Sequence, residues 1–405
     1  MKIVKIGDHY VSDFVHSEED YKNKKKYSLD LELDETIGAA KLIEIAPSNT
    51  MWGKYWYRSS INTTMTKELG DIVKEITSRI KWNKEDIWLD IACNDGTLLK
   101  QIPEGFIKVG IDPADDTFLQ ESSKHAKVVQ DYFSYNAYSK LNLNKKAKVI
   151  TTIAMFYDLI NPDPFIEDIN KVLDDNGIWV LQMSYTPLMI QQLAFDNICH
   201  EHAYYYSLNS IKKLFERHKL KIVDCTLNDV NGGSFRVYVQ KETANITSFG
   251  TSPLRDVCNF RIQSLLNYEN TSFDIGKKEV WDKFMSDIED LKNQTVNFIK
   301  QEKAKGKKIC GYGASTKGNT LLQWFGLDHT LIDAIAERSP YKYGLKTIGT
   351  NIPIKSEDEV RAMKPDYMIV LPWHFISEFI NRENKFLESG GKFIVPCPKF
   401  EIISK

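Results

Sequence analysis

A short acidic loop between a buried strand and a helix is the most informative chemical feature of the sequence. Residues 88–91 form an apolar strand around Asp90, and a turn of Asn94, Asp95 and Gly96 leads into a helical segment. Such a strand–loop–helix unit opens a nucleotide site at the carboxyl edge of an α/β sheet. A phosphate-binding loop would present bare amides and often a lysine, whereas these carboxylates would repel a pyrophosphate.

The acidity of this loop favours a ligand with a cationic amino group, hydroxyls and a positive sulfur, which describes S-adenosylmethionine (SAM). A second strand ends at Asp112. Its distance from the loop, roughly 20 residues, suits a carboxylate that binds ribose hydroxyls. The simpler alternative is a βα turn with a solvated acidic tip.

A second glycine loop, residues 311–318, also follows a strand and precedes a helix. It carries Ser315, Thr316 and Lys317 in place of acids. It therefore suits an anionic group at a helix N-terminus, and the contrast with the first loop predicts two different ligands. Two alternatives stay open. One is a purely structural turn, and the other is a NAD site, for which Glu337 is the only candidate acid at the end of a second strand.

The segment 195–202 holds two of the eight histidines, His200 and His202, on either side of Glu201. Four interpretations compete: a polar surface turn, a two-ligand metal site on an extended segment, a structural histidine with a glutamate partner, and an acid/base pair. In the last, Glu201 raises the pKa of the His202 imidazole and orients it. No further metal ligands stand nearby at a suitable spacing, so we predict no metal.

Bulk properties exclude several classes of function. The 405-residue chain has a formal net charge of -2, which argues against a nucleic-acid or anionic-membrane partner. No apolar run reaches the roughly 18 residues that span a bilayer, and the N-terminus lacks the apolar core of a signal peptide. The six cysteines are scattered without a C-x-x-C pair. This pattern predicts reduced thiols and a cytoplasmic location.

The periodicity predicts two α/β units. A helix is expected from about residue 66 to residue 80. The strands expected in the first unit lie near 87–92, 107–112, 127–129, 148–154, 177–183, 220–227 and 234–240. A charged helix over 277–304 leads to the second unit, whose expected strands lie near 308–312, 331–336, 366–371 and 392–396. Residues 1–66 show little periodicity.

Six separated motifs, taken together and in this order, resemble the SAM-dependent C-methyltransferases that act on nucleotide-linked 4-keto-deoxysugars. The motifs are residues 57–60, 90–96, 195–202, 231–236, 311–319 and 371–374. The resemblance covers most of the chain. It implies a Rossmann-like methyltransferase domain (67–240), a helical connector (241–304), a second Rossmann-like domain (305–405) for the nucleotide sugar, and a small N-terminal region (1–66).

The resemblance also implies roles for individual residues. His202 is expected to be the general base, Glu201 to support it, and Tyr57 to lie on the sugar side of the same cleft. The residues expected to contact SAM are Asp90, Ala92, Asn94, Asp95, Gly96, Asp112, Asp131, Tyr132, Ala154 and Met155. Those expected to contact the nucleotide sugar are Arg58, Ser59, Ser60, Tyr157, Cys199, Asn231, Gly232, Arg236, Gly313, Ala314, Lys317, Asn319, Glu337, Trp373 and His374. Arg236 is the candidate for a diphosphate contact, because its fork of donors matches phosphate oxygens.

The chain departs from the family pattern at three places. Family members carry an N-terminal zinc domain built on cysteines, but this chain has no cysteine before Cys93, so we predict no zinc there. Cys199 stands where many relatives have tyrosine, and Asn231 stands where some have histidine. The last two departures affect the proton path and the identity of the sugar.

The expected reaction is C-methylation of a 4-keto-deoxysugar at C3, through an enolate formed by His202. Three rival functions stay open: an O- or N-methyltransferase, a nicotinamide-dependent sugar epimerase or reductase, and a non-catalytic SAM- or sugar-binding scaffold. The sequence leaves the nucleotide (TDP, GDP, CDP or UDP), the sugar and the oligomeric state undetermined.

Overall fold

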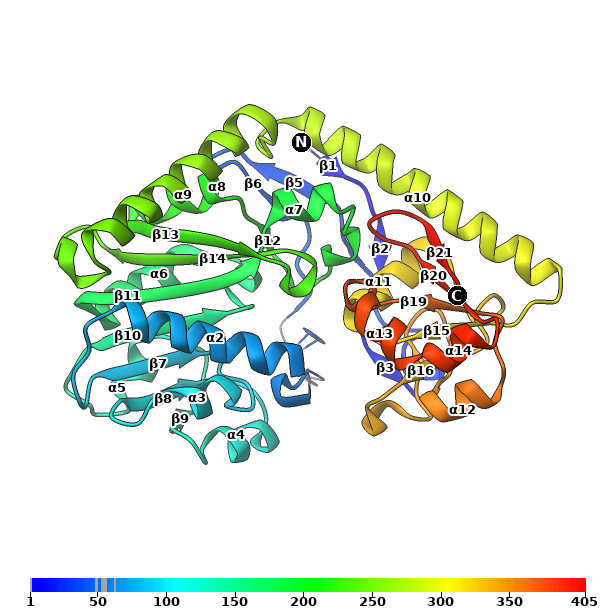
Figure 1. Ribbon diagram of the computed structural model, residues 1–405, viewed down its shortest axis with the longest axis horizontal. Coiled ribbons are helices and arrows are strands. Elements are labelled where there is room, and N and C mark those ends of the chain that lie inside the picture. Colours follow the sequence, from blue (N-terminus) through cyan, green and yellow to red (C-terminus); the bar gives the residue numbers. More distant parts are fainter. Residues whose placement is uncertain (1, 48–49, 52–56, 62) are drawn as a thin grey trace.

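Two lobes, each a sheet with packed helices, make up the protein (Figure 1). The computed structural model describes residues 2–47, 50–51, 57–61 and 63–405, and only the backbone of Asn231 and Ile246. Both lobes have mostly parallel strands with helices between them. The predicted α/β fold with a second, C-terminal α/β domain is therefore confirmed.

The first lobe contains a seven-stranded sheet in the order β13-β14-β11-β10-β7-β8-β9. Its strands are β7 (Ile87–Ile91), β8 (Ile107–Ile111), β9 (Lys127–Val129), β10 (Ala147–Ile153), β11 (Leu173–Ser184), β13 (Leu220–Asn228) and β14 (Ser234–Lys241). Strands β7 to β11 are parallel, and β14 is antiparallel to its neighbours. The chain passes from β7 to β8 on one side and returns later to β10 on the other. In α/β sheets such a reversal leaves a crevice at the carboxyl ends of the strands, where ligands bind.

Helices cover both faces of this sheet. They are α2 (Thr63–Arg79), α3 (Thr97–Gln101), α4 (Asp116–Ser122), α5 (Tyr135–Ser139), α6 (Pro162–Val172), α7 (Thr186–Gln191), α8 (Leu208–Arg217) and α9 (Ser252–Ser272). Helix α2 forms because Leu69, Ile72, Val73 and Ile76 recur at helical spacing, and all four are buried. It begins three residues before the predicted start, at Thr63.

The C-terminal lobe contains a six-stranded sheet in the order β18-β16-β15-β19-β20-β21. Its strands are β15 (Ile309–Tyr312), β16 (Ile335–Glu337), β18 (Ile354–Ser356), β19 (Tyr367–Val370), β20 (Lys392–Val395) and β21 (Glu401–Ile403), and only β21 is antiparallel. Its helices are α11 (Thr316–Phe325), α12 (Glu357–Ala362), α13 (Ile376–Arg382) and α14 (Asn384–Glu388). The long helix α10 (Lys278–Ala304) leads into this lobe and buries Trp281, Phe284, Ile288 and Ile299.

The N-terminal residues connect the two lobes through short strands, which the sequence did not predict. Strands β1 (Lys2–Val4), β5 (Leu31–Asp34) and β6 (Ala39–Leu42) form a sheet with β12 (Tyr204–Tyr205), which lies in the first lobe. Strand β3 (Phe14–Val15) pairs with β17 (Lys346–Thr347) of the C-terminal lobe. Strands β2 (Asp8–His9) and β4 (Tyr27–Ser28) pair with each other. The region therefore acts as a clamp between the lobes.

No described helix combines the length and the apolar character that crossing a bilayer requires. A buried carboxylate of the first lobe joins three of its elements. The Asp224 side chain in β13 is fully buried, and its carboxylate accepts hydrogen bonds from Arg79 at the end of α2 (2.5 Å) and from Nε of Arg261 in α9 (2.9 Å). The cluster ties both helices to the sheet.

Removing this carboxylate leaves Arg261 without its carboxylate partner and leaves Arg79 paired with Glu75 alone. We expect Asp224→Ala to lower the free energy of unfolding by about 3–5 kcal/mol, as urea denaturation measures it. The matched control is Asp175→Ala, because the Asp175 carboxylate is 73% exposed and pairs with Lys146 and Lys241 at the surface. That change should cost less than about 1 kcal/mol. Equal losses for the two variants would contradict this assignment.

Candidate active site

The loop after β7 has an unusual backbone. Ala92, Asn94 and Gly96 have φ angles of 58°, 52° and 77°, and Ala154 at the end of the neighbouring strand β10 has φ 55°. Left-handed conformations in non-glycine residues are uncommon and cost about 1–3 kcal/mol each, and they concentrate at functional sites. At Gly96 a Cβ would lie 2.7 Å from the Ser122 Cα, so only glycine fits this turn. Three strained non-glycine positions and one glycine turn therefore gather at the edge where the sheet order reverses.

Carboxylates organise the same edge. Asp112, after β8, accepts hydrogen bonds from the amides of Asn94 and Ala114, both at 2.7 Å. These bonds leave lone pairs of the carboxylate free for ligand hydroxyls. Asp90 is buried and accepts from the Thr151 hydroxyl at 2.6 Å, and burial raises the pKa of Asp90 to about 7. The tight turn and the paired acids fit a SAM molecule better than a pyrophosphate.

The segment that precedes α2 packs on this loop. The amide of Ser59 donates to Asn94 Oδ1 (3.1 Å) and that of Ser60 to Asp95 Oδ2 (3.0 Å). Asn94 Nδ2 donates to the carbonyl oxygen of Tyr57. Arg58, expected near the sugar, instead donates to the Thr117 hydroxyl, and its guanidinium lies over the Phe118 ring. Arg58, Ser59 and Ser60 thus pack against the acidic loop and helix α4.

A pocket lies at the carboxyl ends of β10 and β11, beside the loop. It is lined by Met65, Ile153, Ala154, Tyr157, Gln182, Met183, Ser184 and Ser234. Its position favours Ala154 and Met155 as cofactor contacts.

Asp131 and Tyr132, also expected at the cofactor, lie further along the edge after β9. Tyr132 is 59% exposed, and Asp131 pairs with Lys140 at 2.7 Å.

His202 lies beside this pocket, with its ring 4.1 Å from the Tyr157 ring between centroids. Its Nδ1 is 2.8 Å from the carbonyl oxygen of Asn197. Because a carbonyl can only accept, Nδ1 carries the proton, and the lone pair is on Nε2. Burial, and then the charge of Lys317, lower the pKa of His202 to about 3. The imidazole is therefore neutral near pH 7 and can take up a proton at Nε2.

Glu201 does not hold the imidazole, in contrast to the expectation. The His202 proton on Nδ1 goes to Asn197, whereas Glu201 Oε2 is buried and has no hydrogen-bond partner. Asp158 Oδ1 is also buried without a partner. Burial raises the pKa of both carboxyl groups, and the proximity of Glu201 raises the pKa of Asp158 further. Cys199, expected near the substrate, is buried beside Glu201, and burial raises the pKa of its thiol well above its ordinary value.

His200 is a structural histidine. Its Nε2 lies 3.0 Å from the carbonyl oxygen of Tyr27 in the N-terminal clamp. Burial lowers its pKa to about 4. Among the described residues, no group of three or more His, Cys, Asp or Glu side chains could hold a metal ion.

The second glycine loop makes contacts inside the protein. Glu337 accepts from the Ala314 amide at 2.8 Å, and a Cβ at Gly313 would lie 2.6 Å from Pro372. The Asn319 side-chain amide donates to Ser12 and Asp13 of the clamp, and Lys317 reaches Asn197. These groups therefore bind other parts of the chain, and the suitability of the loop for an anionic group stays a prediction.

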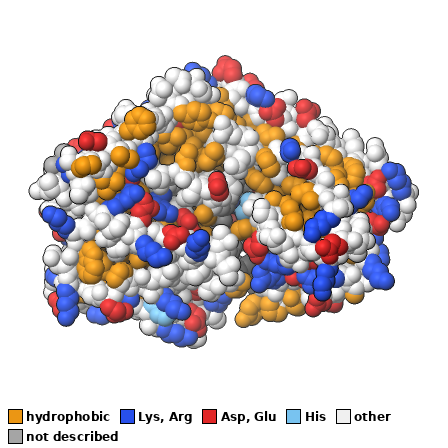
Figure 2. All heavy atoms as spheres, viewed as in Figure 1, with side chains coloured by type: hydrophobic (Ala, Val, Ile, Leu, Met, Phe, Trp, Pro, Cys, Tyr) orange, Lys and Arg blue, Asp and Glu red, His pale blue; other side chains and the backbone are white. Residues whose placement is uncertain are grey.

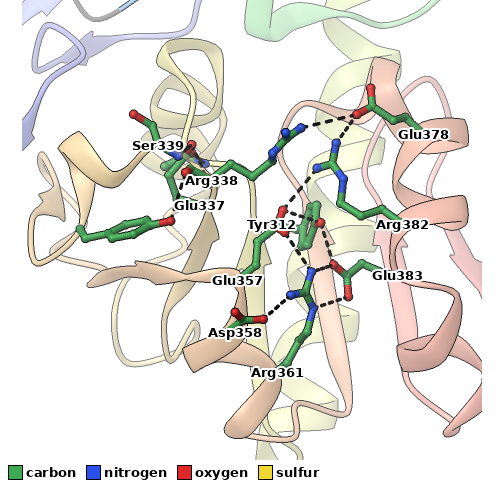
Figure 3. Close-up of polar contacts among 12 residues, drawn as sticks. Tyr312, Glu337, Arg338, Ser339, Glu357, Asp358, Arg361, Glu378, Arg382 and Glu383 are labelled. Atoms are coloured by element: carbon green, nitrogen blue, oxygen red, sulfur yellow. Dashed lines mark hydrogen bonds and ion pairs between the residues drawn. The ribbon is translucent and has the colours of Figure 1, made fainter. Parts of the chain in front are cut away.

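Figure 3 shows that polar side chains at the neighbouring edge of this lobe also bind one another. Glu337 accepts hydrogen bonds from the amides of Arg338 and Ser339, and the Arg338 guanidinium reaches Glu378, which joins this group to a network around Tyr312. There the Tyr312 hydroxyl lies 2.8 Å from carboxylate oxygens of both Glu357 and Glu383 and donates its one proton to either of them. Arg361 and Arg382 complete this network by pairing with the acidic side chains.

Trp373 and Gly232 meet across the two lobes. Trp373 is 5% exposed and donates from Nε1 to Asp196 Oδ2 at 3.0 Å, and a Cβ at Gly232 would lie 3.5 Å from its ring. His374 packs beside it, and burial and Lys317 lower the pKa of His374 to about 3. The side chain of Asn231 lies outside the described part of the structure. The surface is hollowed between the lobes, and histidine atoms are visible there (Figure 2).

Arg236 differs from its expected role. It is 6% exposed, pairs with Glu68 (2.6 Å) and Glu75, and donates from Nε to Gln182 at 2.9 Å. Its guanidinium is thus committed to the core between α2 and the sheet rather than to a diphosphate.

Sequence reasoning missed two residues of this site. Asn197 contacts His202 through its backbone carbonyl, and every residue has such a carbonyl, so the residue type does not reveal this contact. Asp158 directly follows Tyr157 at the end of a predicted strand, and that position was the only signal for it.

Comparison with known proteins divides the chain in the same way as the structure. Residues 61–224 match a family described as methyltransferase domain, and residues 229–398 match the C-methyltransferase C-terminal domain family. The chain is similar to the C-methyltransferase NovU of Streptomyces niveus, with 26% identity over 389 residues that cover 96% of this chain and 90% of the relative.

Among solved structures, an S-adenosylmethionine-dependent methyltransferase of Clostridium acetobutylicum aligns with a TM-score of 0.34 and 15% identity. The alignment covers 44% of this chain and 92% of that one. The plantazolicin methyltransferase BpumL in complex with SAH aligns with a TM-score of 0.36 and 13% identity, over 45% of this chain and 87% of that one.

The geometry of Asp112 predicts its effect on cofactor binding. We expect Asp112→Ala to weaken binding of S-adenosylhomocysteine (SAH) at least about tenfold in calorimetry, because a charged hydrogen-bond acceptor is worth roughly 1.5–3 kcal/mol. Asp112→Asn, which keeps one acceptor oxygen, should lose less. Asp175→Ala removes an exposed carboxylate of the same lobe that is outside the expected cofactor site and serves as the comparison, with SAH affinity unchanged. Unchanged SAH affinity in Asp112→Ala would remove this residue from the cofactor site.

Proposed function

Because this chain belongs to the SAM-dependent C-methyltransferases, we propose that it methylates C3 of a nucleotide-linked 4-keto-deoxysugar. The observation that carries this proposal is the neutral His202, with its lone pair on Nε2 beside the pocket at the reversal of the sheet order. A carbon beside a ketone becomes a nucleophile only after it loses a proton, and this imidazole is placed to take one.

The steps follow from that requirement. Nε2 of His202 takes the proton from C3, and the C–H electron pair forms an enolate whose charge is on O4. SAM, when bound, would supply the methyl group for this carbon from its sulfonium and leave as SAH. The imidazolium then gives its proton to solvent. Asp90, Asn94, Asp95, Gly96 and Asp112 hold the cofactor in this proposal.

The enolate oxygen needs a hydrogen-bond donor, since an imidazole is a weak base for a carbon acid. One well-placed donor is worth roughly 2.7–4 kcal/mol in such a site. Tyr157 and Tyr57 are the candidate donors. Tyr157 is the stronger candidate because it lines the pocket and its ring contacts the ring of His202.

The nucleotide sugar enters this proposal from the side of the C-terminal lobe. Residues 195–202, which include the proposed base His202, are here called the base segment. The part of the C-terminal lobe that faces it is formed by Lys317, Trp373 and His374. Incubating the protein with SAM and a panel of TDP-, GDP-, CDP- and UDP-linked 4-keto-deoxysugars tests the proposal. NMR of the product should place the new methyl group on carbon. A methyl group on oxygen or nitrogen would overturn it in favour of the rival methyltransferase.

The first mutational test concerns the base. We expect His202→Asn to reduce turnover by about 10²–10⁴-fold while SAH still binds, because proton abstraction is lost and the cofactor loop is intact. Exchange of the C3 proton with deuterated solvent should disappear as well.

His200→Asn is the matched control, because His200 is a buried histidine of the same segment that bonds to Tyr27 instead. Its turnover should stay within about tenfold of that of the unaltered protein. Turnover of His202→Asn at the level of this control would remove His202 from the mechanism.

The second test concerns the donor. Tyr157→Phe keeps the ring against His202 and removes the hydroxyl. We expect kcat to fall about 10²–10³-fold, as when one oxyanion donor is lost, with less change in KM. Tyr57→Phe, measured in parallel, shows which phenol serves the enolate. If both variants keep full kcat, neither phenol is the donor.

A further inference from the structure

The base segment of the first lobe is held by the C-terminal lobe. Three consecutive residues of the 3₁₀ helix η4 (Phe195–Asn197) each contact that lobe, and all three are buried. The Phe195 ring lies 4.7 Å from the Trp324 ring and 5.2 Å from the Phe325 ring between centroids. Asp196 accepts from Trp373 at 3.0 Å. Asn197 Oδ1 accepts a hydrogen bond from Nζ of Lys317, in the first turn of α11.

Asn197 contacts both Lys317 and His202. Its side chain is held by Lys317, while its backbone carbonyl accepts the proton on His202 Nδ1 at 2.8 Å. A displacement of Lys317 therefore shifts the acceptor that fixes the tautomer of the imidazole. The path from the second lobe to the base consists of two hydrogen bonds through one residue.

Burial lowers the pKa of Lys317, and the neighbouring Asp196 carboxylate opposes that shift and favours the charged ammonium. Burial raises the pKa of the nearby carboxyl groups, which favours their neutral forms, and lowers the pKa of the neighbouring imidazole of His374. The titratable groups around His202 and Lys317 are Tyr157 and Asp158 of η3 (Phe156–Asp158), Asp196 of η4, Cys199, Glu201, Tyr205 of β12, and His374 of η8 (Trp373–Phe375). The charge on Lys317 opposes a second positive charge on His202.

We propose that Lys317 is a positioning residue for His202: through Asn197 it keeps the ring proton on Nδ1, and its charge keeps Nε2 free of a proton. The catalytic meaning of this link rests on the proposed function. The link itself is a property of the folded chain, and it can be measured without turnover.

The experiment observes the imidazole directly. The full chain is labelled with ¹⁵N-histidine, the His202 signals are assigned by their loss in His202→Asn, and the spectra are titrated from alkaline to acidic pH. In the unaltered protein we expect the neutral form with the proton on Nδ1 down to mildly acidic pH. In Lys317→Met the protonation midpoint of His202 should rise by about one pH unit or more, because a neighbouring positive charge is gone.

Two conservative variants separate charge from anchoring. Lys317→Arg keeps the charge and a donor, and should restore most of the unaltered midpoint. Lys317→Gln keeps a donor without the charge, so the midpoint should rise while the Nδ1 tautomer persists. Lys317→Gln also serves if Lys317→Met fails to fold.

Lys342→Met is the matched control. Lys342 is a buried lysine of the same lobe, but it donates to the Ala314 carbonyl and, among the contacts of the described residues, has none with η4. Its loss should leave the His202 midpoint unchanged. If the charge-removing Lys317 variants keep that midpoint, or if Lys342→Met shifts it equally, the proposal is overturned. If the midpoint moves as expected but no sugar is methylated at carbon, only the proposed function fails.

Discussion

The hydrogen bond from Nδ1 of His202 to the carbonyl oxygen of Asn197 is the interaction on which the candidate site depends. It fixes which ring nitrogen bears the proton, and so which one can act as a base. A carboxylate in that place would stabilise the imidazolium strongly and hold a proton on the ring. A neutral carbonyl orients the ring with less bias toward the charged form, so burial can keep the imidazole neutral.

Three parts of the chain hold that bond in place. The C-terminal lobe contacts η4, and the first lobe supplies Tyr157 against the ring. The N-terminal clamp binds the residues on either side of His202: the Leu42 amide donates to the Ala203 carbonyl at 3.0 Å, and His200 meets the Tyr27 carbonyl. His202 thus lies where all three parts meet, although its own segment is short and irregular.

The sequence predicted the elements with strong periodicity and the residues at strand ends. Helix α2, the strands of the first sheet, and Asp112 after β8 follow from local patterns that any α/β sheet imposes. The N-terminal strands carry no such pattern, because each has two to four residues and several pair with strands far along the chain. Likewise, the burial of Arg236 depends on Glu68 and Glu75, which precede it by 168 and 161 residues. The sequence shows that residue 236 is an arginine, which can bind an anionic group. Only the tertiary fold shows which carboxylates it contacts.

The pairing of β3 with β17 has a consequence for synthesis of the protein. Val15 is translated long before its partner Lys346. Until the second lobe has been made and has docked, η4 lacks its contacts with Trp324, Trp373 and Lys317, and Phe195 lacks its aromatic partners from that lobe. A nascent chain can fold the seven-stranded sheet first, but the surroundings of His202 are complete only after the second lobe has joined it. Under the proposed function, growing chains that already hold SAM would stay chemically silent until then.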